Sequence, residues 1–447
     1  MNEVGAFARR KCPCCNNPWS AASEETKEGG STPMASLPSL PCDPCLADNK
    51  GFSGLDPSNI DPSVSLKENF YLWSNGNWMK NNQIPAEYSS WNTFISLRDT
   101  NLSRIQAILQ DLSANGDIST KEISSNEQKL SDFYTTALDE SLIESQGLAV
   151  LQPLLDICHQ ASKNPTLAIA ELHAKFGVNV LFHLYADADS KDSSHTIGNI
   201  SQSGLGLPDR DYYFDEDKAE KRAKYLAYIS SLFTCLHKEM PNLVDLNTPR
   251  KCELAAKEVM LIETGLAKAF MTRTERRDPE KTYNLMSQAE LSALTREAPT
   301  HGSYLARGPN QKSFEWGLYF DAIGKSGADM GSVNVRTVEA LKKVECVINH
   351  PSFTHYLLFH SLNAYAPHLT HAMTEAHFAF HETELKGTKE QKPRWKRSLE
   401  ALEEALGDAL GVCYVERYFA GDAKTRALRI VERVKDALRA RLNEVRN

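Results

Sequence analysis

The amino-acid sequence predicts a mainly α protein, a multi-helix lobe with a few short strands and ordered loops. Apolar residues recur at spacings of three and four along much of the chain, which places them on one face of a helix. Sustained alternation of apolar and polar residues, the pattern of a half-buried strand, is scarce. With 447 residues and 41% hydrophobic content, the chain is also long enough for more than one core, because single cores stop growing near roughly 250 to 300 residues.

Separate segments carry these helical signals in chain order. Leucine and isoleucine repeat at helical spacing through 102–112, and tyrosine, isoleucine and leucine do so through 225–236. Ser287 followed by Glu290 has the form of a capping box that begins another helix. The apolar residues of 428–445 predict a helix that continues almost to the last residue. Long amphipathic helices are therefore expected to dominate the fold.

The remaining patterns suggest a small strand content and a change of composition near the start. Residues 177–187 are expected to hold one or two short strands, and no run of strands predicts a central sheet. Residues 1–57 are rich in cysteine, serine and proline and are predicted to be disordered. Residues 58–447 are predicted to form one helical domain.

Five cysteines crowd the first segment and make a weak metal-site signal. The pair Cys42 and Cys45 has the spacing of a metal knuckle, and the cysteines upstream supply further thiolates. The complete candidate set is Cys12, Cys14, Cys15, Cys42 and Cys45. The surrounding segment has few residues able to form a core around a metal, so disorder is preferred; a small zinc knot and acylated thiols are the alternatives.

Charge and hydropathy limit the classes of partner. The formal net charge of -8 disfavours nucleic acid, whose binding proteins usually cluster lysine and arginine on one face. No apolar run approaches the ~18 to 20 residues that span a bilayer, and the first residues lack a signal peptide's apolar segment. We therefore expect a soluble, intracellular protein, in the cytoplasm, without a transmembrane segment.

Four blocks of sequence, in order along the chain, carry a resemblance to a known family. They are 69–78 with 84–86 and 94–99; 203–213, which contains Gly204-Leu205-Gly206-Leu207-Pro208; 263–267 with 276–279 and 283–284; and 385–390 with 394–396, Gly407, Gly411, 414–415 and Phe419. These blocks resemble the N-terminal helical domain of the neprilysin and endothelin-converting-enzyme family of zinc metalloendopeptidases. The resemblance covers about Asp61 to the last residue and implies the helical lobe of such an enzyme.

Arg98 is the substrate-binding residue that the resemblance implies. In the family, the arginine of the Leu-Arg-Asp segment reaches into the active-site cavity and binds the carboxylate at the C-terminal end of a peptide. A guanidinium suits this role because it remains charged and grips a carboxylate with two parallel hydrogen bonds. The alternative is a surface arginine that pairs with Asp99 or with another nearby acid.

The zinc motif that the family uses is absent from these residues. The family enzyme holds zinc with two histidines four apart, uses the glutamate between them as general base and takes a third, acidic ligand from a following helix. Among the 13 histidines only His381 is followed by a glutamate, and Leu385 stands where the second histidine is required. We therefore expect zinc in the complete family enzyme, but no metal and no catalytic residue in this chain, whose catalytic zinc domain is absent.

Two histidine groups and one peptide motif have the spacing of functional sites but are interpreted differently. The first group is His377, His381 and Glu384, and the second is His368, His371 and Glu375. Both have helical spacing and are interpreted as partly exposed structural histidines. Asn363-Ala364-Tyr365 is similar to a substrate-binding motif of the family, but it stands in the wrong block. The glycine-rich loop that leads to Tyr212 and Tyr213 is interpreted as a structural corner.

Departures from the family pattern bear on the compartment. Secreted members carry a cysteine where this chain has Ser74, and a disulfide pair at the positions that align with Ala137 and Ser398. Loss of both partners of a pair is typical of a protein from a reducing compartment or of a bacterial-type member of the family.

Two functional hypotheses follow. In the first, the chain is the helical lobe of a truncated or incomplete neprilysin-like metalloendopeptidase that cleaves short peptides, so enzymatic activity of this chain itself is uncertain. In the second, it is a non-catalytic peptide-binding or protein-interaction module derived from that family. A lobe without the catalytic segment exposes an apolar face, so we also expect self-association.

Overall fold

The computed structural model describes residues 56–114, 125–241, 243, 246–297, 311–325, 330–419 and 421–446. The chain separates into two units, residues 1–84 and 85–447. All five N-terminal cysteines of the candidate metal set lie outside the described residues, as does most of the segment predicted to be disordered.

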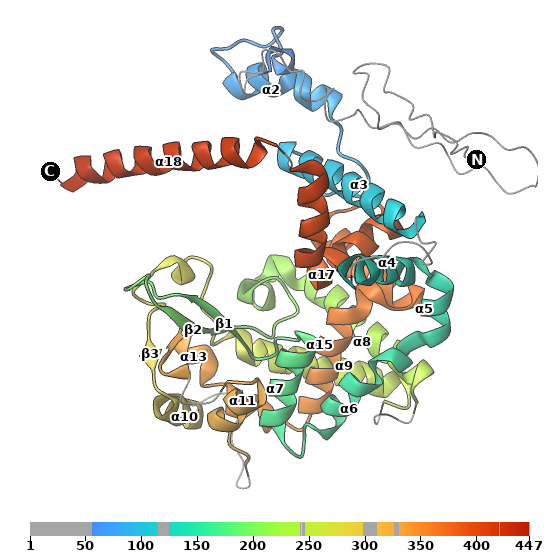
Figure 1. The fold of residues 1–447 in the computed structure, drawn as a ribbon. Helices are drawn as coiled ribbons and strands as arrows, with labels where there is room; N and C mark the ends of the chain where they lie inside the picture. Colours follow the sequence, from blue (N-terminus) through green and yellow to red (C-terminus); the bar gives the residue numbers. More distant parts are fainter. Residues whose placement is uncertain are drawn as a thin grey trace, which may run out of the picture. The chain divides into compact units, whose positions relative to one another are not determined.

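The larger unit is built mainly from helices, which confirms the predicted fold class (Figure 1). Its α-helices are α3 (Thr93–Ala114), α4 (Ser125–Leu138), α5 (Glu140–Gln146), α6 (Gln152–Gln160), α7 (Pro165–Phe176), α8 (Ala219–Glu239), α9 (Pro249–Ala267), α10 (Gln288–Arg296), α11 (Trp316–Ala322), α13 (Val338–Leu341), α14 (Val344–Ile348), α15 (Phe353–Tyr365), α16 (His371–His377), α17 (Arg394–Tyr418) and α18 (Ala423–Arg446). Shorter turns are η2 (Gly147–Leu151), η3 (Arg210–Tyr213), η4 (Glu216–Lys218), η5 (Glu275–Arg277), η6 (Ala366–His368) and the π-helical η7 (Phe378–Glu384).

The predicted helices lie where the apolar spacing places them. Segment 102–112 belongs to α3, segment 225–236 to α8, and segment 428–445 to α18. The predicted capping box begins α10, where Ser287 accepts from the Glu290 backbone and the Glu290 carboxylate accepts from the Ser287 backbone. Both orphan donors at this helix start are thereby satisfied.

A small sheet is more extensive than the sequence suggested. Its strands are β1 (Phe182–Ala188), β2 (Thr196–Gln202), β3 (Leu285–Met286) and β4 (Val333–Val335), in the order β1-β2-β4-β3. The β1–β2 hairpin is antiparallel, β2 and β4 are parallel, and β3 runs antiparallel to β4. The first strand overlaps the predicted segment 177–187. The last two contain 2 and 3 residues, too few for an alternating pattern to show.

Two hydrophobic clusters fill the larger unit. The main cluster is built from helices such as α7, α8, α9 and α15 and from the inner face of the sheet. The second joins α3, α4 and α17 through Leu102, Leu109, Leu130, Leu399 and Leu402. This second cluster fixes the position of α3 against α17, and the candidate site lies along these two helices.

The glycine-rich loop is a structural corner packed over a buried carboxylate. Glu263 of α9 is fully buried and accepts hydrogen bonds from the hydroxyls of Tyr213 at 2.8 Å and Tyr225 at 2.9 Å. Gly206 stands beside this cluster, because a Cβ there would lie 1.9 Å from the Tyr225 hydroxyl. Gly204 has a φ of +92°, and its carbonyl accepts from the Tyr356 hydroxyl at 2.9 Å. The loop therefore requires glycine for both space and backbone conformation.

The described part of the smaller unit contains η1 (Pro57–Asn59) and α2 (Phe70–Asn81). Asp61 ties the two together: its backbone N–H donates to the Trp73 carbonyl at 2.8 Å, and its carboxylate accepts from Lys80 at 2.6 Å. The hydrogen bond from Lys80, together with those from the Ser63 side chain and backbone, lowers the pKa of Asp61 to about 2. Gly76 is required beneath it, because a Cβ there would meet the Asp61 Cβ at 2.7 Å.

Candidate functional site

A charged cavity of about 640 Å³ lies in the larger unit and includes Arg98 in its wall. Its lining comes from Glu87, from Arg98 of α3, from residues 367–392 and from the first half of α17. Six glutamates and four lysines or arginines line it, together with His368 and His377. The excess of acids favours a ligand that carries positive charge somewhere along its length.

Arg98 projects from α3 toward two acids of α17. Its Nη2 lies 3.4 Å from the Glu400 carboxylate and 4.0 Å from the Glu403 carboxylate, and its side chain is 62% exposed. The structure therefore pairs Arg98 with nearby glutamates rather than with Asp99. Such half-exposed pairs contribute little free energy, so an incoming anion competes with them at low cost.

Asp99, the next residue, points into a separate network that anchors α3. Its Oδ1 accepts a hydrogen bond from the Tyr88 hydroxyl at 2.6 Å and another from the Lys396 ammonium. Lys396 also donates to Glu87 and is only 7% exposed. Burial by itself would lower the pKa of Lys396, but the hydrogen bonds to Asp99 and Glu87 raise it above its usual value. The ammonium therefore stays charged and holds the Arg98 segment against α17.

The sequence alone does not reveal this network. Its pattern suggests that Arg394 and Trp395 form a local packing pair, and Arg394 does contact the fold locally, because its Nε donates to the Ala137 carbonyl at 2.7 Å. The residue that matters more for the site is the following one, Lys396. The sequence signal that could have identified Lys396 is its position between a tryptophan and an arginine, in a block that resembles the family.

Two further residues of α17 shape the cavity wall. Burial raises the pKa of Glu403, with Arg98 opposing the rise and Glu400 adding to it. Arg397 is 20% exposed and lies 3.9 Å from Glu140, while its buried Nη1 has no hydrogen-bond partner. The cavity thus contains one carboxylate and one guanidinium that are incompletely satisfied by the protein.

The histidines singled out from the sequence include a pair that is packed within the fold. His377 and His381 stack ring on ring at 4.3 Å, and His381 Nε2 lies 2.9 Å from the Asn363 side-chain oxygen. Burial lowers the pKa of His377 to about 4 and that of His381 to about 3. His371 pairs with Glu375 on the surface at 3.1 Å.

Asn363 itself is occupied within the fold. Besides contacting His381, its side-chain oxygen accepts from the Tyr228 hydroxyl at 2.7 Å. The Asn363 side chain therefore helps to pack α15 against its neighbours.

The donor set does not fit zinc in the part of the chain that the structure describes. Among those residues there is no group of three or more histidine, cysteine, aspartate or glutamate side chains placed to hold a metal ion. The Nε2 atom of His381 already lies 2.9 Å from the Asn363 side-chain oxygen, so it is not an open coordination position. No chemical step through zinc is therefore assigned to these residues.

Ala137 and Ser398, at which the resemblance implies a disulfide in secreted members, are adjacent in space. Ser398 Oγ donates to the Ala137 carbonyl at 3.1 Å. The contact supports the alignment by which these two residues stand where secreted members carry a cystine. All five cysteines in the described ranges are thiols.

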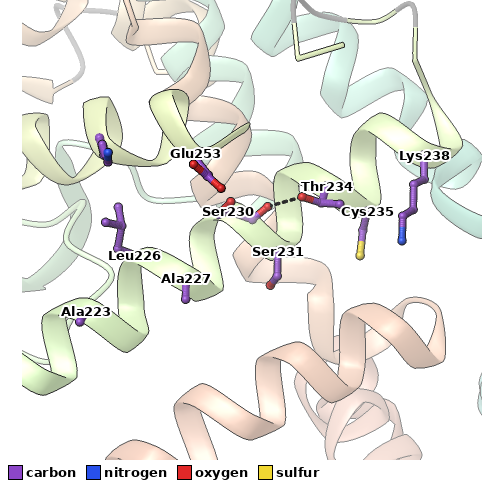
Figure 2. A pocket seen from close by; sticks show the side chains of 10 residues that line it. Ala223, Leu226, Ala227, Ser230, Ser231, Thr234, Cys235, Lys238 and Glu253 are labelled. Carbon is purple, nitrogen blue, oxygen red and sulfur yellow. Dashed lines mark hydrogen bonds between the residues drawn. The ribbon is translucent and has the colours of Figure 1, made fainter. Parts of the chain in front are cut away.

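A second groove, of about 630 Å³, runs along α8 and α9 (Figure 2). Small side chains of α8 line it, including Ala227, Ser231 and Cys235, and Thr234 donates to the Ser230 carbonyl at 2.8 Å. Burial raises the pKa of the Cys235 thiol, which disfavours a reactive thiolate. No chemistry is assigned to this groove.

Among the helices in the described ranges, none is both long and apolar enough to cross a membrane. The lobe is helical, has a charged cavity with an exposed arginine in its wall, and contains the four motif blocks. This combination is typical of the N-terminal part of a neprilysin-like metallopeptidase. The family model described as Peptidase family M13, in its N-terminal part, matches residues 66–446. The chain therefore belongs to peptidase family M13.

Known proteins agree with this assignment. Endothelin-converting enzyme 1 from Bos taurus is 28% identical over 405 residues, which cover 87% of this chain and 49% of the relative. The Homo sapiens enzyme of the same name is 28% identical, with 87% and 48% covered. The chain spans about half the length of these curated relatives.

Solved structures give the same result. The zinc metalloprotease Zmp1 of Mycobacterium tuberculosis, in complex with an inhibitor, superposes with a TM-score of 0.74 at 28% identity, over 87% of this chain and 55% of that one. PepO from Lactobacillus rhamnosis shares the fold, with a TM-score of 0.62 at 17% identity, over 85% and 56% of the two chains.

Proposed function

We propose that this chain is the peptide-binding helical lobe of a zinc metalloendopeptidase that acts on short peptides, with the zinc chemistry supplied by residues outside these 447. Family membership and the names of the relatives support the activity of the complete enzyme. The absence of a His-Glu-x-x-His sequence supports the separation of binding from catalysis.

The observation that carries the proposal is the placement of Arg98. Its guanidinium is 62% exposed at a cavity wall, while Asp99 and the buried Lys396 hold its helix in place. The two glutamates that it faces lie at 3.4 and 4.0 Å, outside ideal hydrogen-bond geometry. A peptide carboxylate that binds in a bidentate manner replaces these weak contacts with stronger ones.

Peptide binding with two forms of one ligand tests this role. A fluorescently labelled peptide with a free C-terminal carboxylate should bind more tightly than its amide, by about tenfold for one charge-assisted contact. Arg98→Ala should abolish the difference, and Arg98→Lys should retain part of it. Arg429→Ala, on the exposed α18, is the matched control. Equal affinities for acid and amide in the unmodified protein would remove the basis of the proposal.

A second candidate is a non-catalytic peptide-binding or protein-interaction module. It is favoured by the exposed apolar side chains of α18, which include Leu428, Val434 and Leu438 at 54%, 63% and 57% exposure. This stripe is the surface on which we also propose self-association. Hydrolysis of a peptide after addition of a catalytic partner segment favours the first candidate, whereas binding without any gain of hydrolysis favours the second.

We infer an intracellular, cytoplasmic location from the thiol pattern. Ala137 and Ser398 are adjacent, yet neither is a cysteine. Both halves of the cross-link are thus missing together, as expected where disulfides do not form. Fractionation of the cells that produce the protein tests this inference, and recovery from the secreted fraction would contradict it.

A further inference from the structure

We propose that Glu403 makes this lobe selective for peptides whose last residue is basic. The inference rests on the proposed function, in which Arg98 binds the C-terminal carboxylate. It identifies the class of peptide that the cavity takes: a free acid that ends in lysine or arginine.

The two acids that face Arg98 are not equivalent. Glu400 lies 3.4 Å from Arg98 and also accepts from Lys392 at 2.6 Å. Within the described ranges, the one ion-pair partner of Glu403 is Arg98 at 4.0 Å. When a peptide carboxylate binds Arg98, Glu400 therefore keeps its ion pair with Lys392, whereas Glu403 loses its ion pair with Arg98.

An unpaired carboxylate is unfavourable at this position. The Glu403 side chain is 36% exposed, and its burial raises its pKa. The cavity offers little compensation, because six glutamates already face four lysines and arginines. A carboxylate ligand without a cation thus adds a seventh acid to the wall. A ligand with its own cation leaves the excess of acids in the cavity unchanged.

The distances place this cation on the last residue of the peptide. Both glutamates approach the same nitrogen of Arg98, at 3.4 and 4.0 Å, so a carboxylate bound there lies directly beside Glu403. The side chain and the carboxylate of the last residue branch from one Cα atom. A lysine or arginine side chain reaches several ångströms from that atom, far enough to meet Glu403 while the carboxylate stays on Arg98.

The test uses the full chain and four labelled peptides of one sequence, ending in lysine or norleucine, each as acid and amide. Norleucine keeps the aliphatic length of lysine without the charge. We expect the unmodified protein to bind the lysine acid about threefold more tightly than the norleucine acid, as a half-exposed ion pair allows. Glu403→Gln should remove this preference. Glu416→Gln, the same change on an exposed part of α17, should retain it.

A second readout separates selectivity from a merely structural effect. Glu403→Gln removes a competitor for Arg98, so it should raise the affinity for the norleucine acid while lowering that for the lysine acid. Weaker binding of both acids in this variant would overturn the inference. So would a lysine preference that survives Glu403→Gln, or its absence in the unmodified protein.

The outcomes also distinguish this inference from the proposed function. A preference for acid over amide that depends on Arg98, without any preference for lysine, leaves the proposed function standing and overturns only the role of Glu403. Equal binding of acids and amides, or no binding of any of the four peptides, overturns both.

Discussion

Gly206 shows how one residue of a recognisable motif is fixed by the core beneath it. A Cβ at this position would lie 1.9 Å from the Tyr225 hydroxyl, which donates to the buried carboxylate of Glu263. If Tyr225 moved away, the buried Glu263 carboxylate would lose this hydrogen bond. The Gly-Leu-Gly-Leu-Pro loop therefore belongs to the architecture of the lobe and not to its ligand-binding surface.

The substitution Gly206→Ala tests this explanation. We expect it to lower the free energy of unfolding by about 1 to 3 kcal/mol, because overpacking forces a shift of Tyr225 or of the loop. Urea denaturation measures the change. Gly411→Ala is the matched control, since nothing lies within 4 Å of a Cβ there; alanine in that helix should be neutral or stabilising by up to about 1 kcal/mol. Equal stability of the two variants would refute the explanation.

Arg98 illustrates what one sequence can and cannot reveal about a site. The resemblance identifies the arginine, and its chemistry explains the choice of residue type. Its actual partners are not predictable, because Glu400 lies 302 residues away along the chain. Lys396 escapes prediction for the same reason: its carboxylate partners Glu87 and Asp99 precede it by 309 and 297 residues. Contacts of this separation depend on tertiary packing and not on a local pattern.

At the scale of elements, the π-helical segment η7 and helix α16 contain a pair of histidines that should make the protein sensitive to acid. Burial lowers the pKa of His377 to about 4 and of His381 to about 3, from an ordinary value of 6.5. The native state thus binds fewer protons than the unfolded chain. The contribution of these two histidines to the free energy of unfolding is fully present above pH 6.5. It declines as the pH falls toward the lower pKa values of the native state.

Stability measured as a function of pH tests this coupling. Each histidine should contribute a slope of about 1.4 kcal/mol per pH unit below its unfolded pKa. His381→Gln should reduce the slope between pH 6.5 and 4.5, as followed by urea denaturation. The exposed His195 supplies the control, and His195→Gln should leave the slope unchanged. A slope that is insensitive to His381→Gln would show that this residue is not buried in its neutral form.

Helix α18 carries the strongest prediction about association. Its apolar stripe is exposed, with Val434 at 63% and Leu438 at 57%. Leu438→Glu should shift the protein toward monomer in analytical ultracentrifugation, because a charge in an apolar contact is costly. Ala440→Glu adds the same charge on the nearly opposite helix face and should have little effect. A protein that is already monomeric, or that responds equally to both changes, would contradict self-association through α18.

Helices are more predictable than strands for a physical reason. Several turns of helix, as in α3, α8 and α18, repeat their apolar spacing often enough to be recognised. The capping box of α10 is a local hydrogen-bond pattern and is equally recognisable. By contrast, β3 and β4 are defined only by the partners that they find, since β4 pairs with β2 across more than a hundred residues. Their existence is a property of the fold and not of their own sequence.

At the scale of the whole molecule, the chain spans about half the length of its relatives and retains a recognisable part of their fold. Two hydrophobic clusters support it, one of them joining α3 to α17 and so supporting the cavity wall. The larger unit thus positions Arg98 and Glu403 with its own packing. We therefore expect binding of a peptide and cleavage of a peptide to be separable properties.

Hydrolysis of a quenched fluorescent peptide by the purified chain, with and without a chelator, tests this separation most directly. We predict no chelator-sensitive cleavage, even with zinc supplied, because the described residues include no suitable donor set and the sequence lacks His-Glu-x-x-His. Chelator-sensitive cleavage by this chain alone would contradict the separation and would require a zinc site built from other residues.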